Sequence, residues 1–203
     1  MKRVKFIRHS KLEHPYDDYS QLTFNQICGL ATGRLSPGIH TDSQKMLIEK
    51  LNTKELKSFD LILCSQSRRT IQTAILIRKL SGKQMKIKKT DNLSEIYFDP
   101  AVLISKDEFT QHGLSSIRIS VFHGMKDNTG AESLDEVLNR AQKLKDELKM
   151  LPHDNILCIT HSFYMRVIRL FFLDKLTASR TISVKKLMNT IDHNYLEGFE
   201  IEL

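Results

Sequence analysis

The sequence predicts an α/β fold in which helices cover both faces of a mostly parallel sheet. Three short apolar runs of strand length, Val4–Ile7, Leu61–Cys64 and Ile156–Thr160, lie far apart along the chain. Segments with apolar residues at helical spacing separate these runs. Parallel strands need crossover connections of this kind, and such crossovers are nearly always right-handed. The pattern therefore predicts one sheet between two layers of helices.

The first half of the chain adds two candidate helices and one candidate strand. Residues 11–38 are polar and rich in turn-forming residues, so we expect a loop with one short helix there. Apolar side chains at helical spacing predict a helix over residues 42–51. A second helix is expected over residues 67–80, with Gly82 as its stop signal. A short strand is expected at residues 85–88.

The second half of the chain begins with a segment that the pattern does not assign. Residues 93–130 show no clear period, and we expect irregular structure there. Ser133 and Glu136 have the spacing of a capping box and open a helix with one apolar stripe. An apolar helix is expected over residues 163–173, and alternation at residues 195–203 predicts an edge strand.

Composition places the chain among folded globular proteins. Of its 203 residues, 40% are hydrophobic and 27% are charged. No apolar run approaches the ~18 residues that a membrane span needs, and Lys5 and Arg8 interrupt the first apolar stretch, unlike a signal peptide. The three cysteines fit a reducing compartment. We expect residues 1–203 to form a single cytoplasmic domain without a membrane partner.

The charge is positive and uneven. The chain has 31 Lys and Arg against 24 Asp and Glu, a net charge of +7, and its pI is about 9.3. Residues 1–89 hold 18 of the basic and 7 of the acidic side chains. This excess fits nucleic acid, a small anionic substrate, or simple solvation of the surface. Composition alone leaves all three open.

Chemically active side chains follow the predicted strands. Arg8-His9-Ser10 follows the first strand, Ser65–Arg69 the second, Glu95 the third, and His161 the fourth. Ligands of open α/β sheets bind beyond the carboxyl ends of the strands. We therefore expect two histidines, at least two arginines and a carboxylate to converge at one edge of the sheet.

These side chains suit phosphoryl transfer. Guanidinium groups bind phosphate oxygens in pairs and keep their charge. A neutral imidazole is a nucleophile at physiological pH, and a second, protonated histidine can neutralise charge on the phosphoryl oxygens. A carboxylic acid can protonate the leaving oxygen. The set predicts transfer through a phosphohistidine, with no metal and no cofactor.

Several motifs resemble the histidine phosphatase superfamily, the phosphoglycerate mutase-like proteins. Arg8-His9-Ser10 is similar to that family's Arg-His-Gly signature. The other similar segments, in the family's order, are Gly33–Leu35 before a helix, Ser65–Ala74, Leu93–Glu95, Gly130–Ser133 and Ile159–Ser162. The resemblance runs from Val4 to about Arg169. It implies a three-layer αβα sandwich with a mostly parallel central sheet.

The same resemblance implies a role for each matching residue. His9 would be the phosphorylated nucleophile, Arg8 and Arg69 would bind the phosphoryl oxygens, and His161 would share that pocket. Glu95 would donate a proton to the leaving group and later act as the base for water.

The chain departs from the family pattern at several points. Ser10 and Ser162 stand where the family usually has glycine after each histidine, and they would crowd the pocket or add hydroxyl groups to it. The family's Asn after the first motif has no clear counterpart, and the Trp-containing pattern after Glu95 is absent. The segments 11–32 and 98–129 would line the mouth of the pocket, but neither has a pattern that names a ligand.

Three other residues in or beside these motifs have ordinary structural interpretations. Cys64 precedes a basic loop, yet three residues separate it from Arg68 and four from Arg69, whereas cysteine phosphatases need five. We therefore expect Cys64 in the core and Arg68 outside the phosphoryl pocket. Glu132 is interpreted as a charge that complements a helix N-terminus.

The favoured function is hydrolysis of a phosphomonoester of a small metabolite by a metal-independent phosphatase of the histidine acid type. The alternatives are a phosphoglycerate-type phosphomutase and a phosphohistidine-protein phosphatase. From another class, the chain could be a catalytically retired protein that binds phosphate or nucleic acid. We expect a small phosphorylated substrate rather than nucleic acid as the partner, and the sequence does not indicate an oligomeric state.

Overall fold

The computed structural model describes residues 1–174 and 184–203, and the strands of this part of the chain form one sheet in the order β3-β2-β4-β1-β5. They are β1 (Arg3–Arg8), β2 (Leu61–Cys64), β3 (Lys86–Lys89), β4 (Asn155–Thr160) and β5 (Gly198–Glu202). The first four pair in parallel, and β5 runs antiparallel to β1 at the edge. The predicted mostly parallel sheet with a final edge strand is confirmed.

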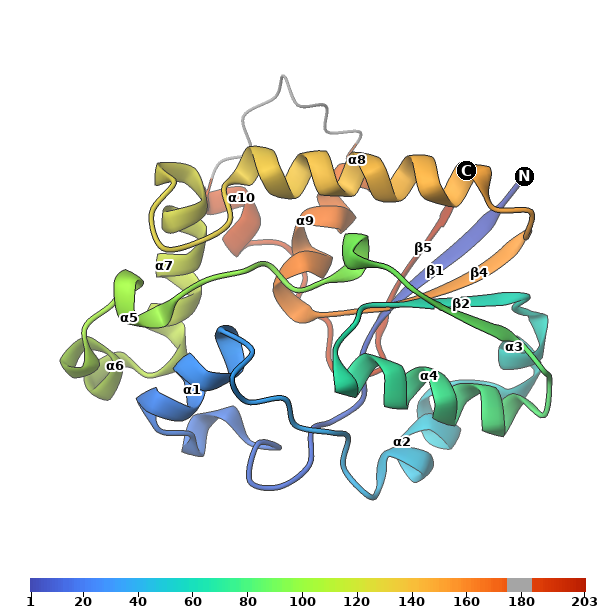
Figure 1. Ribbon diagram of the computed structural model, residues 1–203, viewed down its shortest axis with the longest axis horizontal. Coiled ribbons are helices and arrows are strands. Elements are labelled where there is room, and N and C mark those ends of the chain that lie inside the picture. The colour runs from blue at the N-terminus through green and yellow to red at the C-terminus, as the bar shows by residue number, and fades with distance from the viewer. Residues whose placement is uncertain (175–183) are drawn as a thin grey trace.

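Helices cover both faces of this sheet (Figure 1). One face packs against α8 (Leu134–Met150) and α9 (Ser162–Leu173). The other packs against α2 (Ser43–Lys50), α3 (Thr53–Ser58) and α4 (Arg68–Ser81). The predicted three-layer αβα sandwich is therefore confirmed, although α3 was not expected from the sequence.

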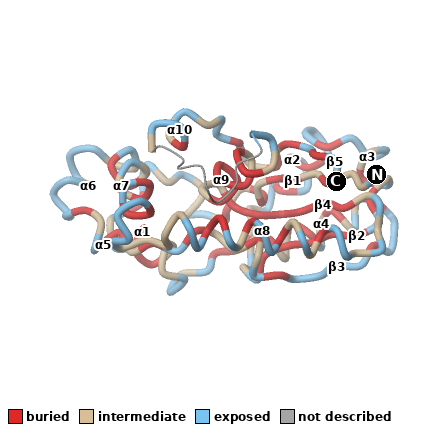
Figure 2. Tube along the Cα trace, turned by 90° about the horizontal axis from the view of Figure 1, so that it is seen from above, coloured by how far each residue is buried: buried red, intermediate tan, exposed pale blue. Residues whose placement is uncertain are grey.

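The alternation of strand side chains separates two hydrophobic cores. Phe6 of β1 and Cys158 of β4 face the α8 and α9 core, whereas Ile7 and Ile159 face the α2 to α4 core. Because successive strand residues point to opposite faces, a strand buried on both sides must be apolar throughout. Figure 2 shows β4 buried along most of its length.

The helix over residues 134–150 forms as its sequence predicts. Ser133 Oγ accepts from the backbone N–H of Glu136, whose carboxylate accepts in return from the backbone N–H of Ser133. The buried stripe of α8 consists of Val137, Leu138, Ala141, Leu144 and Leu148. In a different helix, α4, the predicted stop signal Gly82 is confirmed: it ends the helix in the left-handed conformation with φ 66°.

Several helices gather at the end of the molecule away from the termini (Figures 1 and 2). They are α1 (Phe24–Ala31), α5 (Pro100–Leu103), α6 (Lys106–His112) and α7 (Leu114–Asp127). The short helices η1 (Tyr19–Gln21), η2 (Asp91–Leu93) and α10 (Val184–Met188) complete the described elements.

The expectation of irregular structure over residues 93–130 is wrong. Ser105 caps α6 by accepting from the backbone N–H of Glu108, and Gly113 with φ 60° separates α6 from α7. The apolar spacing of Ile117 and Val121 is helical, and both are buried in α7. The segment is divided into short helices whose apolar faces are completed by packing against one another, so no single long period appears in the sequence.

The edge strand β3 carries three lysines of the basic first half of the chain, Lys86, Lys88 and Lys89. Edge strands offer unpaired backbone groups to other chains, and lysines there oppose such pairing. Lys88 also pairs with Glu147 at 2.8 Å, and nearby Lys83 pairs with Asp60 at 3.1 Å.

In the described part of the chain, no helix is long and apolar enough to cross a membrane.

A side chain at Gly198 should destabilise the sheet beside the candidate site. Gly198 lies opposite Ile7, and a Cβ added there would overlap the carbonyl oxygen of Phe6. We expect Gly198→Ala to lower the free energy of unfolding by at least ~2 kcal/mol in urea titrations. Gly82→Ala is the control: it has open space and carries only a strained φ, which costs ~1 kcal/mol. Equal losses in the two variants would contradict this account.

Candidate active site

The carboxyl ends of three neighbouring strands bring the predicted residues together. β1 ends at Arg8 and is followed by His9, β4 is followed by His161, and Arg69 lies in the first turn of α4 after β2. Arg8, His9, Arg69 and Glu95 line one cavity of about 170 Å³. His161 is buried behind this surface, with its ring centroid 5.3 Å from that of His9.

His9 is held as a neutral imidazole with a free ring nitrogen. Its Nδ1 lies 2.7 Å from the carbonyl oxygen of Ser10, which can only accept, so Nδ1 carries the proton. The pKa of His9 lies well below 6.5, because the ring is buried and because Arg69 and Arg8 disfavour a further positive charge. Nε2 therefore keeps its lone pair, as a nucleophile requires.

His161 is also neutral, in contrast to the protonated second histidine that we expected. Arg69 donates to His161 Nδ1 from Nε at 3.2 Å and from Nη2 at 3.0 Å. Nδ1 must therefore accept, and Nε2 donates to Ser65 Oγ at 2.8 Å. Burial and the charge of Arg69 are the main reasons why the pKa of His161 lies well below 6.5. In this state His161 holds the guanidinium of Arg69 rather than supplying a charge.

Arg8 is anchored beside the cavity by contacts from the C-terminal segment. Its Nη1 donates to the carbonyl oxygen of His193 at 3.1 Å, and its guanidinium lies 4.3 Å from the ring centroid of Tyr195. Within residues 1–174 and 184–203, the buried Nε of Arg8 has no hydrogen-bond acceptor. A buried N–H donor of this kind can bind an anionic oxygen.

Glu95 lies at the N-terminus of α9. Its Oε1 accepts from the backbone N–H groups of Ile96 at 3.0 Å and Tyr164 at 2.8 Å, and its Oε2 accepts from that of Phe163 at 3.3 Å. Burial raises the pKa of Glu95, although these backbone donors and Arg69 oppose the rise. A raised pKa suits a carboxyl group that gives up and recovers a proton near neutral pH.

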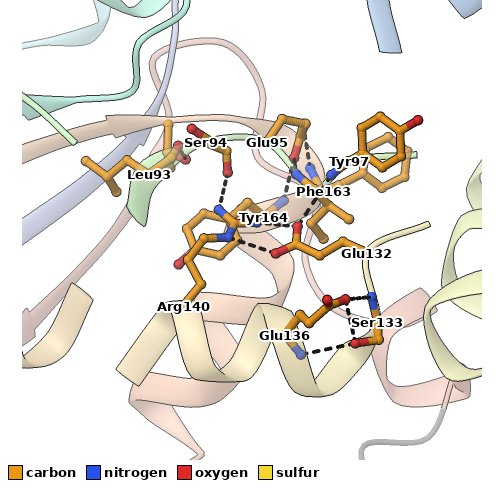
Figure 3. A network of polar contacts seen from close by, with 12 residues as sticks. Leu93, Ser94, Glu95, Tyr97, Glu132, Ser133, Glu136, Arg140, Phe163 and Tyr164 are labelled. Atoms are coloured by element: carbon orange, nitrogen blue, oxygen red, sulfur yellow. Dashed lines mark hydrogen bonds and ion pairs between the residues drawn. The ribbon is translucent and has the colours of Figure 1, made fainter. Parts of the chain in front are cut away.

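A second network holds the loop of Glu95 in place (Figure 3). Arg140 of α8 donates to the carbonyl oxygen of Ser94 at 2.6 Å and to both carboxylate oxygens of Glu132, at 3.0 and 2.7 Å. The backbone N–H of Glu132 donates to the carbonyl oxygen of Tyr97 at 2.8 Å, and the Glu132 carboxylate accepts from the backbone N–H of Tyr97 at 3.4 Å. Glu132 therefore does more than complement a helix dipole. Together with Arg140 it holds the loop on both sides of Glu95, at Ser94 and at Tyr97.

The two serines that replace glycine differ in their surroundings. The Ser10 hydroxyl donates to Ser43 Oγ at 2.8 Å and is fully buried, so it does not crowd the cavity. Ser162 does line the cavity and donates to Asp192 at 3.2 Å.

The structural interpretations of Cys64 and Arg68 agree with the structure. Cys64 is buried in the core between β2 and α4, and burial raises the pKa of its thiol to about 11. Arg68 lies outside the cavity lining and pairs with Glu13 at 3.6 Å. In the described residues, no three His, Cys, Asp or Glu side chains form a group that could hold a metal ion.

Sequence reasoning did not single out Arg140, Ser65, Tyr195 or Asp192. Ser65 begins the segment Ser65–Ala74 that resembles the histidine phosphatase superfamily, and that resemblance is the signal that could have identified it. The other three reach the site through contacts between distant segments and carry no local signal. The segments expected to line the mouth of the cavity do so, through Tyr19, Ile27, Leu30, Ala31, Phe98, Leu114, Ile117 and Arg118.

This sandwich, with two buried histidines at adjacent strand ends, has the architecture of the phosphoglycerate mutase-like proteins. Residues 45–190 match the family model described as the histidine phosphatase superfamily (branch 1). The chain belongs to that superfamily. The matched residues include Arg69, Glu95 and His161, whereas Arg8 and His9 precede them.

Three solved structures illustrate the shared fold. The mycobacterial glucosyl-3-phosphoglycerate phosphatase is 15% identical, with a TM-score of 0.62 over 96% of this chain and 87% of that one. The α-ribazole phosphatase of Shigella flexneri is 17% identical, with a TM-score of 0.57 over 94% and 86%. The phosphoglycerate mutase of Bacillus anthracis is 15% identical, with a TM-score of 0.57 over 86% and 81%. No curated protein sequence matches the chain.

The two buried histidines should make stability depend on pH. Both have pKa values below the 6.5 of an unfolded histidine, so below about pH 6.5 the unfolded chain takes up protons that the folded chain does not. The free energy of unfolding should therefore fall with falling pH, by up to ~1.4 kcal/mol per pH unit for each histidine. We expect His161→Gln to reduce the pH dependence of the free energy of unfolding between pH 6.5 and 5.5. The reduction, measured by urea titrations, should correspond to the uptake of about one proton fewer on unfolding.

The control for this titration is His123→Gln, because His123 is exposed on α7. This variant should keep the slope of the parent protein. An unchanged slope in His161→Gln would contradict the neutral state assigned to His161.

Proposed function

We propose that this chain is a phosphatase that hydrolyses a phosphomonoester of a small metabolite through a phosphohistidine on His9. The observation that carries the proposal is the unprotonated Nε2 of His9 in a cavity that Arg8, Arg69 and Glu95 also line. These groups supply a nucleophile, two fixed positive charges and an acid, with no part assigned to a metal or cofactor.

The first half of the reaction transfers the phosphoryl group to His9. Arg8 and Arg69 bind the phosphoryl oxygens, and the buried Nε–H of Arg8 is one available donor. His9 Nε2 then forms a bond to phosphorus while the bond from phosphorus to the ester oxygen breaks. The protonated carboxyl group of Glu95 gives its proton to that oxygen, and the alcohol leaves.

The second half returns the enzyme to its starting state. The carboxylate of Glu95 takes a proton from water as the water oxygen attacks phosphorus. The bond from phosphorus to His9 Nε2 breaks, and inorganic phosphate is released. Glu95 is again protonated, and its backbone contacts with α9 keep the carboxyl group in place during both steps.

His161 serves as a positioning residue in this scheme. Its Nδ1 accepts from two nitrogens of Arg69, which directs the guanidinium before substrate binds. When Arg69 turns its donors to the phosphoryl oxygens, His161 Nδ1 is released and can take up a proton. The second positive charge that the chemistry requires would then appear only with substrate bound.

We place the protein in the cytoplasm, which its three buried, unpaired cysteines support. Residues 1–203 act as one domain, because the two cores share a single sheet. Nucleic acid is not proposed as a partner, since the lysines near β3 include Lys83 and Lys88, which are paired with acidic side chains.

Replacing the nucleophile should abolish turnover. We expect His9→Ala to lower kcat/KM for p-nitrophenyl phosphate by at least ~10³-fold, because no other group can form the intermediate. The parent protein should form an acid-labile phosphoenzyme in a rapid-quench experiment, and chelators should not change its rate. His123→Ala should retain full activity. Hydrolysis that survives in His9→Ala would refute the mechanism, and a long-lived phosphoenzyme that returns its phosphoryl group to the alcohol would indicate a mutase.

Replacing the acid should slow poor leaving groups most. We expect Glu95→Gln to lower kcat/KM for phenyl phosphate by ~10²-fold, because phenolate needs a proton to leave. The loss for 2,4-dinitrophenyl phosphate should be only a few-fold, since that leaving group departs as an anion. Asp91→Asn is the control, as Asp91 is exposed at the start of η2. Equal losses for the two substrates would argue against Glu95 as the proton donor.

A further inference from the structure

The cavity beside His9 has a substantial apolar wall besides its charged groups. Its apolar lining comes mainly from Ile27, Leu30, Phe98, Leu114, Ile117 and Phe163. These side chains belong to α1, α7 and α9 and to the loop after Glu95. A surface of this composition favours an aromatic or aliphatic group over a hydrated polar one.

A third part of the lining carries two arginines with a carboxylate between them. Asp192 Oδ2 lies 2.9 Å from Arg118 Nη2 and 3.0 Å from Arg166 Nη2. The other oxygen, Oδ1, accepts from the hydroxyl of Ser162 at 3.2 Å. All four residues line the same cavity as His9.

Arg166 cannot turn easily toward a ligand. It is only 3% exposed, and its Nη1 donates to the carbonyl oxygens of Leu187, Met188 and Thr190 at 3.3, 3.3 and 2.7 Å. These bonds tie the segment that carries Asp192 to α9. The carboxylate is therefore held between the arginines by both its own contacts and its backbone.

The charge of Asp192 offsets part of the positive charge of Arg118 and Arg166. Burial by itself would raise the pKa of Asp192, but Arg166 and Arg118 together hold it below its usual value. The carboxylate is thus ionised at neutral pH. A second anionic group on a substrate would meet this charge and would find the facing arginine donors already occupied.

On the basis of the proposed phosphatase activity, we propose that Asp192 is a specificity-determining residue that restricts the substrate to phosphomonoesters with an uncharged, apolar organic part. The phosphoryl group faces Arg8 and Arg69, and the organic part lies against the apolar wall. Asp192 excludes substrates whose organic part carries a carboxylate or a second phosphate, because binding them requires breaking its pairs with Arg118 and Arg166.

The test compares three aryl phosphates in the parent protein and in Asp192→Asn. The parent should prefer 1-naphthyl phosphate to phenyl phosphate by several-fold in kcat/KM and should disfavour 4-carboxyphenyl phosphate. Asparagine keeps the shape of the side chain and removes its charge. We expect Asp192→Asn to raise the kcat/KM ratio of 4-carboxyphenyl to phenyl phosphate by about tenfold, as a newly available arginine pairs with the substrate carboxylate.

Two control variants distinguish a local effect from a general one. Asp174→Asn removes a carboxylate that also pairs with a cation, Lys186, but does not line the cavity, so the ratio should not change. In the double variant Asp192→Asn with Arg118→Gln, most of the gain should disappear. A ratio that does not rise in Asp192→Asn, or a gain that persists in the double variant, would overturn the proposal.

A binding measurement separates failure of this proposal from failure of the proposed function. Phenylphosphonate and 4-carboxyphenylphosphonate cannot be hydrolysed, and calorimetry gives their Kd values for both proteins without turnover. A tenfold shift of the Kd ratio in Asp192→Asn supports the role of Asp192 even where hydrolysis is absent, which would refute the phosphatase alone. Hydrolysis of phenyl phosphate with no shift in either ratio would refute the role of Asp192 alone.

Discussion

The parallel pairing of β1 with β4 determines where the two histidines of the candidate site lie, and the other groups of the site are arranged around them. Arg8 stands opposite Thr160, and the backbone N–H of His9 donates to the carbonyl oxygen of Thr160 at 3.0 Å. Both histidines therefore leave the sheet at the same level. A slip of one residue would turn the side chain of His9 to the other face of the sheet and separate it from His161.

Burial beside fixed positive charges then sets the protonation state of both rings. A buried imidazole between arginines is far less costly when neutral, and each proton that remains must find an acceptor. Ser10 accepts from His9, and Ser65 accepts from His161. The same constraint leaves Nε2 of His9 unprotonated, and it lets Nδ1 of His161 accept hydrogen bonds from Arg69.

The charge of the whole chain is a poor guide to the charge of the cavity. Within the basic first half, Arg8 and Arg69 face the cavity, while Lys83 and Lys88 pair with acidic side chains elsewhere. The other two arginines of the cavity come from the second half, which is acidic overall, and they are partly offset by Asp192. Placement rather than composition therefore sets the charge of the cavity, where four arginines meet the carboxylates of Glu95 and Asp192.

The sequence by itself determined the sheet, the main helices α4 and α8, and the groups at the strand ends, because apolar periodicity and capping residues act over a few neighbouring positions. The helices between residues 93 and 130 carry local signals as well, the cap at Ser105 and the spacing of Ile117 and Val121, but Gly113 and the short α5 and α6 interrupt any sustained apolar period. The tertiary structure alone decided that Arg140 holds the loop of Glu95 and that Asp192 lies between Arg118 and Arg166. Arg118 and Asp192 are separated by 74 positions, and no local pattern records a contact that exists only once the chain has folded.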